Sequence, residues 1–312
     1  MTTSVTVTLP ARLHFGFLDM NGGLGRRFGS MGMGIDQLRT RLTLRRAPQG
    51  VVKGPDVGRA ERYLGIMTHA LQIDGQFDLL IEEAIPAHAG LGSGTQLALA
   101  IAAALRQLND MLLDPAADAL LMLRGERSGI GIALFDKGGF MVDGGNGVAA
   151  RAPPVTARLA FPADWRVILL LDPLRQGVHG EAEFAAFRDL PLFPGAAAAQ
   201  ICRLALMQVL PALAEADLPR FGAGIGEIQA IVGDHFAPAQ GGRFASPQVA
   251  KALDVLTRAG AHGPGQSSWG PTGFAFAPNA PDALRLCAAL CADPISRGLD
   301  IRICRGLNHG LM

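Results

Sequence analysis

The sequence predicts an α+β fold with two domains. Stretches with strand and helix patterns alternate along the 312 residues, and irregular glycine-rich segments separate them. A chain of this length with 49% hydrophobic residues can bury one large core or two modest ones. A stretch with three prolines, "RAPPVTARLAFPADW" at 151–165, marks a boundary. We therefore expect one domain over residues 1–160 and a second over 161–312.

The first domain is predicted to begin with strands. Residues 4–9 ("SVTVTL") and 39–45 ("RTRLTLR") alternate hydrophobic and polar side chains, as half-buried strands do. The segment between them has too many glycines for a helix. Residues 60–72 then repeat hydrophobic side chains at helical spacing, and residues 77–85 show the next strand pattern.

A glycine-rich turn and a hydrophobic helix follow. "TQLALAIAAALRQLN" at 95–109 is rich in alanine and leucine and apolar nearly all round, which predicts a buried central helix. In the second domain "RVILLLD" predicts a buried strand, and the last segments "TGFAFAP", "DALRLCAALC" and "LDIRICR" predict a β-α-β unit. The other helices predicted there cover residues 195–216, 218–236 and 247–259.

Composition limits the partners and the compartment. A net charge of +1 gives no sign of binding to nucleic acid or another bulk polyanion. The first residues lack the pattern of a signal peptide, and the apolar run "LALAIAAAL" is too short to span a bilayer. The four cysteines form no CxxC pair, so we expect buried free thiols. These features predict a soluble cytoplasmic protein without a nucleic-acid or membrane partner.

The turn before the hydrophobic helix has the chemistry of an anion site. In "PAHAGLGSGTQLALA" at 86–100 a strand end, a glycine-rich turn and a helix follow one another. The first amides of a helix have no partner inside it, and the helix dipole adds partial positive charge. Glycines let the backbone approach phosphate oxygens, and hydroxyls can donate to them. The predicted phosphate or pyrophosphate cradle consists of Gly90, Leu91, Gly92, Ser93, Gly94 and Thr95.

Two common phosphate fingerprints do not match this turn. No lysine follows it, as a P-loop requires, and the third glycine of a dinucleotide fingerprint is missing. On pattern alone, a flexible turn before a helix remains an open alternative. The stretch resembles the Pro-x-x-x-Gly-Leu-Gly-Ser loop of the GHMP kinase superfamily, where the loop wraps the triphosphate of ATP. This resemblance implies the two-domain α+β fold of that superfamily.

A second motif departs from the kinases. Many GHMP kinases carry an aspartate in a motif resembling Ser-Gly-Ile-Asp, where it acts as a base or electrostatic partner for the substrate hydroxyl. The similar stretch here is "ERSGIGIALF", in which Gly131 takes the place of the aspartate. A glycine cannot accept a proton. Some members of the superfamily lack the aspartate and still phosphorylate, so an ATP-dependent small-molecule kinase remains an alternative.

Several other segments resemble one branch of the superfamily, the β-ribofuranosylaminobenzene 5′-phosphate synthases. They are "ARLHFGFLDMNGGLGRRFGSMGMGID", "GERSGIGIALFDKGGFMVDGG", "GVHGEAEFAAF", "FAPAQGGRF" and "GQSSWGPTGFAF", between about residues 11 and 276. The resemblance implies that the protein condenses phosphoribosyl pyrophosphate with 4-aminobenzoate and releases carbon dioxide and pyrophosphate, on the route to tetrahydromethanopterin. It also implies Mg²⁺, no organic cofactor and a homodimer.

Two further questions stay open at this stage. 4-Hydroxybenzoate would fit the same chemistry as 4-aminobenzoate. The sequence does not reveal which para substituent is preferred. A non-catalytic sensor that binds a small ligand on the same fold is a further alternative to the synthase and the kinase.

The first family-like segment offers three candidate ligand residues. Arg26 can grip a phosphate with two parallel hydrogen bonds. Asp19 can bind magnesium through water or accept from the ribose hydroxyls, or it can form an Asx turn with the Asn-Gly that follows it. His14 lies on a predicted strand, with Arg12 two residues earlier on the same face. It is a candidate for substrate contact, against a purely structural role.

The later segments add candidates with the same two readings, substrate contact or structure. Arg127 can hold a carboxylate or a phosphate, or it can be a surface charge. His179 and Glu181 begin a predicted helix, where acid–base work competes with simple support of the helix dipole. The remaining candidates for catalysis or substrate binding are Ser128, Gln240, Ser267, Ser268 and Thr272.

Overall fold

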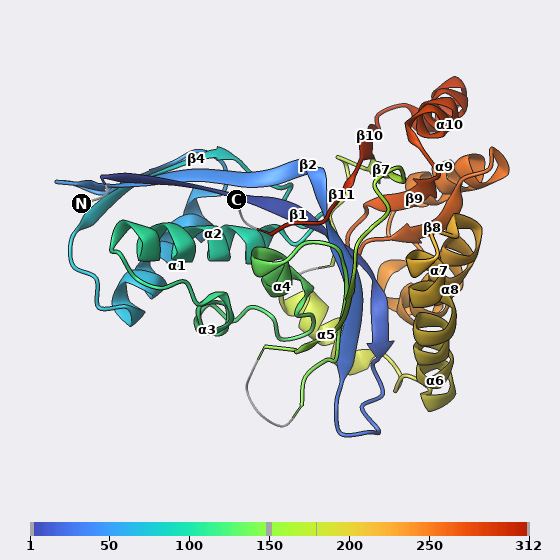
Figure 1. The fold of residues 1–312 in the computed structure, drawn as a ribbon, viewed down its shortest axis with the longest axis horizontal. Coiled ribbons are helices and arrows are strands. Elements are labelled where there is room, and N and C mark those ends of the chain that lie inside the picture. The colour runs from blue at the N-terminus through green and yellow to red at the C-terminus, as the bar shows by residue number, and fades with distance from the viewer. Residues whose placement is uncertain (1–2, 148–151, 179, 311–312) are drawn as a thin grey trace.

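The computed structural model describes residues 3–147, 152–178 and 180–310 and confirms the α+β class. Figure 1 shows an elongated molecule in which two long strands run along one group of helices and enter a second group. The described residues form two sheets: the first is built mainly from residues 4–159 and is joined by the last strand of the chain, and the second is built from residues 166–304. The expected limit between domains at residue 160 stays a prediction.

The first sheet has seven strands in the described residues, with the order β3-β4-β2-β5-β6 and with β1 and β11 also paired to β2. Its strands are β1 (Ser4–Asp19), β2 (Phe28–Ala47), β3 (Val51–Lys53), β4 (Gln76–Glu83), β5 (Phe140–Asp143), β6 (Val155–Leu159) and β11 (Gly306–Leu307). The long antiparallel pair β1–β2 forms the centre of this sheet. Ser4 lies opposite Arg45 at one end of the pair, and Asp19 lies opposite Phe28 at the other.

The two predicted strands at 4–9 and 39–45 are therefore only the ends of a much longer hairpin. The glycine-rich segment between them is largely strand, because its glycines permit close packing rather than a loop. A Cβ atom on Gly32 would lie 2.4 Å from the Leu13 carbonyl oxygen and 2.9 Å from the Ile130 side chain. Glycine at this position lets helix α4 (Ile130–Asp136) pack directly on β2.

One face of the first sheet is covered by α1 (Val57–Ala70), α2 (Ser93–Leu108) and α3 (Pro115–Leu121), as Figure 1 shows. α2 is the buried central helix that the sequence predicts. Its residues from Leu97 to Leu105 are all buried, and they pack against β1, β2 and α1. This packing fixes the direction of α2, so its first turn points to a defined place between the two halves.

The second sheet is antiparallel, with the order β10-β7-β9-β8. Its strands are β7 (Arg166–Leu171), β8 (His262–Gln266), β9 (Gly273–Ala277) and β10 (Asp300–Cys304). The helices of this half are α5 (Glu181–Asp189), α6 (Gly195–Leu204), the π-turn η1 (Ala205–Val209), α7 (Leu210–Ala214), α8 (Leu218–Gln240), α9 (Pro247–Arg258), α10 (Ala280–Ala292) and the 3-10 turn η2 (Pro294–Ser296). The three predicted helices and the β-α-β unit are confirmed.

The two halves share a hydrophobic core at the end of β1. Phe15 is fully buried, stacks on Phe140 of β5 at 5.5 Å between ring centroids, and meets Phe274 of β9 edge-on at 5.1 Å. Residues of α6 and α8 complete the same cluster. One phenylalanine therefore contacts both sheets, and this contact sets how the halves approach each other.

Two expectations about apolar segments and thiols need comment. In the described part of the chain, Gly195–Ala214 is long and apolar enough to cross a membrane by length and composition, but Ile201, Leu204 and Val209 pack into the hydrophobic core. The cysteines are free thiols as expected, yet only Cys304 is buried, and Cys202 and Cys291 are exposed. We expected burial because free cysteines are commonly buried, but Cys202 and Cys291 lie on the exposed faces of α6 and α10.

Candidate active site

A cavity of about 700 Å³ opens where the phosphate loop, α1 and the second domain meet. All the glycines of the predicted cradle line it, together with Ser93 and Thr95 at the start of α2. The segments 121–128 and 268–270 line the rest of it, with parts of β1 and with Gly177, Val178, Gly180 and Glu183. The structure thus brings together several stretches that are far apart in the sequence.

The loop itself depends on glycine backbone geometry. Gly90 and Gly92 have φ values of +78° and +76°, a left-handed conformation that side chains disfavour. A Cβ atom on Gly90 would lie 2.0 Å from the Ser267 carbonyl oxygen. Gly92 is the N-cap of α2, and the first amide bonded inside the helix is that of Gln96. The preceding amides of α2 are left for an anion, as the cradle prediction requires.

Among the described residues that line the cavity there are five arginines: Arg12, Arg59, Arg62, Arg124 and Arg127. The two carboxylates in the same lining are Glu126 and Glu183. The cavity is therefore strongly positive although the whole chain carries a net charge of only +1. A charge of this kind matches a ligand with several phosphate groups.

Arg12 is the most unusual of these arginines. Its backbone N–H donates to the Leu91 carbonyl at 2.9 Å, and its Nε atom lies 3.4 Å from where a Cβ on Gly92 would be. Nε and Nη1 are buried and have no hydrogen-bond partner among the residues that the structure describes. Burial lowers the pKa of Arg12 to about 10, and the charges of Asp143 and Glu183 partly offset this. Arg12 stays cationic at neutral pH and offers unused donors beside the cradle.

Two more arginines meet at the next glycine of the loop. A Cβ atom on Gly94 would lie 3.3 Å from Arg59 Nη1 and 3.4 Å from Arg124 Cζ. Arg59 is held by an ion pair with Asp56, which raises its pKa through their hydrogen bond. Arg124 donates to the Tyr63 hydroxyl. Both guanidinium groups are therefore oriented before any ligand arrives.

Gly131 occupies the position of the kinase aspartate and offers only backbone atoms there. Gly131 lies in the first turn of α4, and its carbonyl accepts a hydrogen bond from Gln96 Nε2 at 3.0 Å. A Cβ atom on Gly131 would lie 3.1 Å from Thr95 Cγ2, so a side chain here would press on the start of α2. No carboxylate can act as a base from this position.

The nearest buried carboxylate has a structural task. Asp143, at the end of β5, accepts from the backbone amides of Gly129 and Gly145, each at 2.9 Å, and from the Ser30 hydroxyl. Burial raises the pKa of Asp143, and these hydrogen bonds oppose that shift. Ser128, a predicted site residue, lines the cavity with its Oγ 2.7 Å from Ser30 Oγ. Asp143 thus holds the turn that presents Ser128.

His14 lies in the wall of the same cavity, on the strand that also carries Arg12. The side chain is 1% exposed, and Nδ1 accepts a hydrogen bond from the Gly16 amide at 3.2 Å. The pKa of His14 is lowered well below its usual value, first by burial and then by the charge of Arg12. The imidazole is therefore neutral, with its proton on Nε2.

The predicted third motif divides into distinct roles. Ser267 Oγ donates to the Gly90 carbonyl at 2.8 Å and accepts from the His14 amide at 3.1 Å, so it ties the phosphate loop to β1. Ser268, with φ +56°, lines the cavity. Thr272 is fully buried outside the cavity lining, and its carbonyl accepts from the Ser267 amide. The prediction of a ligand contact at Thr272 is not supported by this placement.

Arg127 and Glu183 form an ion pair across the cavity wall, and Arg127 also stacks over the Phe187 ring at 4.4 Å. Glu181 is exposed in the first turn of α5, where it favours the helix dipole. Gln240 lies at the end of α8 and lines a smaller cavity of about 20 Å³ behind His14. His179, the remaining predicted residue of this group, falls outside the described residues.

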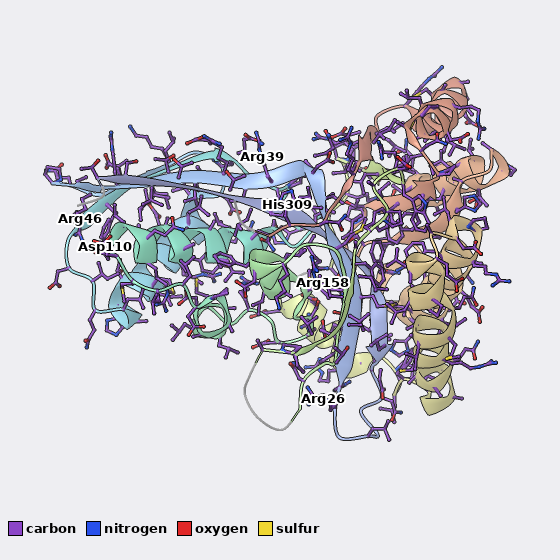
Figure 2. All side chains as sticks on the ribbon, viewed as in Figure 1. Arg26, Arg39, Arg46, Asp110, Arg158 and His309 are labelled. Carbon is purple, nitrogen blue, oxygen red and sulfur yellow. The ribbon has the colours of Figure 1, made fainter. Side chains whose placement is uncertain are left out.

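Asp19 and Arg26 lie outside the cavity. Arg26 donates to the carbonyls of Gly144, at 2.7 Å, and Gly145, at 2.6 Å, and Figure 2 places it near the tip of the β1–β2 hairpin, away from α2. Asp19 Oδ1 accepts from the amides of Asn21 and Gly22, which is the Asx turn considered as its alternative. Their roles in binding phosphate or metal stay predictions that this arrangement does not support.

Sequence reasoning missed Arg59 and Arg62 as site residues and used Arg12 only as a neighbour of His14. Arg12 could have been found from its position two residues before His14 on one strand face. Arg59 and Arg62 carry no such signal, because they lie outside the family-like segments and only the packing of α1 beside α2 brings them to the cavity.

Comparison with known proteins agrees with this geometry. The family model described as the GHMP kinases N terminal domain matches residues 58–139, and the GHMP kinases C terminal model matches residues 209–295. Among solved structures, homoserine kinase from Cytophaga hutchinsonii has a TM-score of 0.71 at 17% identity, covering 100% of this chain and 98% of that one. Mevalonate diphosphate decarboxylase from Staphylococcus aureus has a TM-score of 0.69 at 16% identity, with the same coverage. These structures show the fold.

Sequence relatives are more specific. The beta-ribofuranosylphenol 5'-phosphate synthase of Archaeoglobus fulgidus is 34% identical over 234 residues, which are 71% of this chain and 74% of that protein. The protein of the same name from Methanothermobacter thermautotrophicus is 30% identical over 303 residues, which are 90% and 91% of the two chains. The chain belongs to the beta-ribofuranosylphenol 5'-phosphate synthase family of the GHMP kinase superfamily.

Proposed function

We propose that this protein condenses phosphoribosyl pyrophosphate with a para-substituted benzoate, releases carbon dioxide and pyrophosphate, and thereby serves methanopterin biosynthesis. The observation that carries the proposal is the pairing of a strongly cationic phosphate cavity with a glycine at position 131. The cavity suits a pyrophosphate, and the site lacks the carboxylate that a kinase would use to activate a hydroxyl.

The reaction needs a held leaving group more than an enzymic base. The bond from ribose C1 to the pyrophosphate oxygen breaks, and its electron pair leaves with pyrophosphate. The ring carbon that bears the carboxylate forms the new bond to C1. The bond to the carboxylate then breaks, its electron pair restores the aromatic ring, and carbon dioxide departs. Atoms and charges balance without a net proton transfer.

The chain's own residues can supply what this sequence of steps requires. Charge that develops on the departing pyrophosphate meets the amides at the start of α2 and the guanidinium groups of Arg12, Arg59 and Arg124. Because these donors are positioned in advance, they stabilise the transition state without reorganisation. The reaction also requires that water be kept from the ribosyl carbon, and the apolar part of the wall, with Phe17 and Trp269, lies where it could do so.

We infer that the preferred arene is 4-hydroxybenzoate rather than 4-aminobenzoate. The relatives in Archaeoglobus fulgidus and Methanothermobacter thermautotrophicus are named for a ribofuranosylphenol. A phenol is the product that follows when the para substituent of the benzoate is a hydroxyl. This replaces the aminobenzene product implied by the first resemblance.

Mg²⁺ remains part of the proposal, with a limited role for protein ligands. Among the described residues, no group of three histidine, cysteine, aspartate or glutamate side chains gathers as a metal site. Asp19, the predicted ligand, lies in a turn outside the cavity. Mg²⁺ is commonly bound by substrate phosphates with one or two carboxylates. The ion would then enter with phosphoribosyl pyrophosphate, and the protein's arginines act whether or not a carboxylate joins it.

One assay tests the function. The protein is incubated with phosphoribosyl pyrophosphate, Mg²⁺ and 4-hydroxybenzoate, and carbon dioxide and pyrophosphate are measured together. We expect the two products in equal amounts, and loss of turnover when the ion is chelated. Phosphate transfer from ATP without release of carbon dioxide would instead identify a kinase. Binding of phosphoribosyl pyrophosphate without turnover would identify a sensor.

A further inference from the structure

A buried donor in the cavity wall has no assigned task. Nε2 of His14 carries the imidazole proton, and it finds no hydrogen-bond partner in the part of the chain that the structure describes. A buried donor without a partner costs stability, so such groups commonly meet a ligand. His14 lines the cavity, and its other ring nitrogen is occupied by the Gly16 amide. Beside His14, the described lining offers one further buried indole donor without a partner, Nε1 of Trp269, whereas the unpartnered guanidinium nitrogens belong to Arg12 and Arg124.

The side chains around His14 form a wall that suits an aromatic ligand. Phe17 meets the imidazole edge-on, with ring centroids 4.7 Å apart, and it lines the cavity with His14. Trp269 lines the same space and is anchored by Phe236 at 4.2 Å and Phe187 at 5.2 Å between ring centroids. Aromatic walls of this kind bind a planar ring by edge and face contacts. The arginine-lined end of the cavity, in contrast, suits phosphate.

The order of groups along β1 gives the direction of the substrate. Arg12 lies beside Gly92, the N-cap of α2, whereas His14 lies beside Ser267, which bonds to Gly90. His14 is therefore further from the start of α2, by about 6–7 Å along the same strand face. Pyrophosphate at α2 places ribose next and the benzoate beyond it. The para substituent, opposite the reacting ring carbon, is the part of the benzoate furthest from the cradle.

We propose that His14 selects the para substituent, because its Nε2–H donates a hydrogen bond to the para oxygen of 4-hydroxybenzoate. This inference rests on the proposed function and names the residue that sets its arene specificity. A phenolic oxygen has lone pairs for this donor. An aromatic amine is a poor acceptor, since its lone pair is delocalised into the ring, and its own N–H groups would face another donor.

A small cavity beside His14 contains possible acceptors for the proton of the phenolic hydroxyl group. The adjoining cavity of about 20 Å³ shares His14, Phe17 and Ser268 with the main one. Amide side chains of Gln229, Gln240 and Gln266 line it. The side-chain oxygens of these three residues already accept, in that order, from the Gln266 amide, Gln266 Nε2 and the Ala245 amide. Each oxygen keeps a second lone pair that a phenolic O–H could use. The burial that keeps His14 neutral also keeps it a single-proton donor on this side.

The test compares two benzoates in three proteins. We measure kcat/KM for 4-hydroxybenzoate and 4-aminobenzoate, and KM for phosphoribosyl pyrophosphate, in the wild type, His14→Phe and His14→Gln. We expect the wild type to prefer the hydroxyl compound. His14→Phe should lower kcat/KM for 4-hydroxybenzoate about 10- to 100-fold, while it changes the 4-aminobenzoate value and the KM for phosphoribosyl pyrophosphate little. His14→Gln should retain part of the preference, since its amide also donates.

The outcomes separate this inference from the function beneath it. Two results would overturn the role of His14 and leave the synthase function intact. One is a wild type that prefers 4-aminobenzoate, and the other is an equal loss of kcat/KM for both benzoates in His14→Phe. A wild type that releases no carbon dioxide from either compound overturns the synthase and the inference together. If His14→Phe does not fold, ¹⁵N NMR of the wild type decides. The His14 Nε2–H signal should shift with 4-hydroxybenzoate, and an unchanged signal contradicts the proposal.

Discussion

Arg12 shows at the scale of one residue how ligand binding and stability oppose each other. Its guanidinium group is buried beside the cradle, and two of its nitrogens have no partner among the described residues. The folded pKa of about 10 lies below the ordinary value of an arginine, so the unfolded chain binds more protons between these two values. Stability therefore rises as pH rises through that window, and the cost of the buried charge is fully present at neutral pH.

We predict that Arg12→Met stabilises the protein without ligand and weakens its affinity for phosphoribosyl pyrophosphate. Removal of the buried charge should raise the free energy of unfolding by about 1–3 kcal/mol, while the lost donors should lower affinity by at least 10-fold. Denaturant unfolding and calorimetric titration measure the two effects. Arg39→Met is the matched control, since Arg39 lies on the outer face of the first sheet (Figure 2) and should leave affinity unchanged. A less stable Arg12→Met protein contradicts this account.

Arg124 and Arg59 act together at the next position of the loop. Both lie within van der Waals reach of a Cβ on Gly94, yet each is held by a different partner, Tyr63 or Asp56. Their orientation therefore does not depend on one another. The site divides its positive charge over several independently held groups, which suits a ligand with more than one phosphate.

At the scale of elements, the phosphate loop and the 267–270 segment form one unit. Gly90 touches the Ser267 carbonyl, Ser267 Oγ bonds back to Gly90, and a Cβ on Gly270 would collide with Ala89 at 2.1 Å. These contacts join the phosphate loop to the second domain. A shift of either segment moves the amides that would hold the pyrophosphate.

We predict that Gly90→Ala destabilises the protein and impairs ligand binding together. The new Cβ meets backbone atoms at 2.0 Å at a residue with φ +78°, so the loop must move. We expect a loss of about 1–3 kcal/mol in the free energy of unfolding and a loss of affinity for phosphoribosyl pyrophosphate of at least 10-fold.

Gly65→Ala is the matched control for that loop variant. Gly65 lies in α1 with open space around it, so alanine there should stabilise the helix by about 0.5–1 kcal/mol without an effect on affinity. Thermal unfolding and titration calorimetry report both quantities for the two variants. Normal affinity in Gly90→Ala would show that the loop does not position the pyrophosphate.

At the scale of the whole molecule, the two halves are joined through a common core. Phe15 reaches Phe140 in the first sheet and Phe274 in the second, and the last strand β11 returns to pair with β2. The cavity lies between the same two halves. The packing that holds the domains together therefore also fixes the distance between the cradle and the aromatic wall.

We predict that Phe15→Ala weakens both halves at once. Loss of a fully buried ring should cost about 3–5 kcal/mol. Unfolding should remain a single transition, because the other residues of the shared cluster still join the two sheets. Fluorescence of Trp165 and Trp269, compared with circular dichroism during denaturant unfolding, measures this. Two separated transitions would show that the halves do not share one cooperative core.

The expected homodimer is a separate question, which light scattering on the purified protein answers.

The sequence alone determined the elements whose signal is local. Alanine and leucine around the whole circumference predicted a buried α2, because such a helix has no face for water. The glycine and hydroxyl pattern before it predicted an anion site, since helix amides and glycine backbones provide one wherever they occur. The family-like segments predicted the branch, and Gly131 weighed against a kinase without excluding it. These conclusions need no knowledge of distant contacts.

The tertiary structure decided what depends on contacts between distant segments. It brought Arg59 and Arg62 of α1 to the cavity, and it left Arg26 near the hairpin tip, although Arg26 and not the other two stands in a family-like segment. It extended β1 and β2 through the glycine-rich segment, because pairing with β5 and packing of α4 outweigh local propensity there. It also fixed the tautomer of His14, since burial and one amide hydrogen bond set where its proton lies. Charge and proton position at a site are properties of the packed chain.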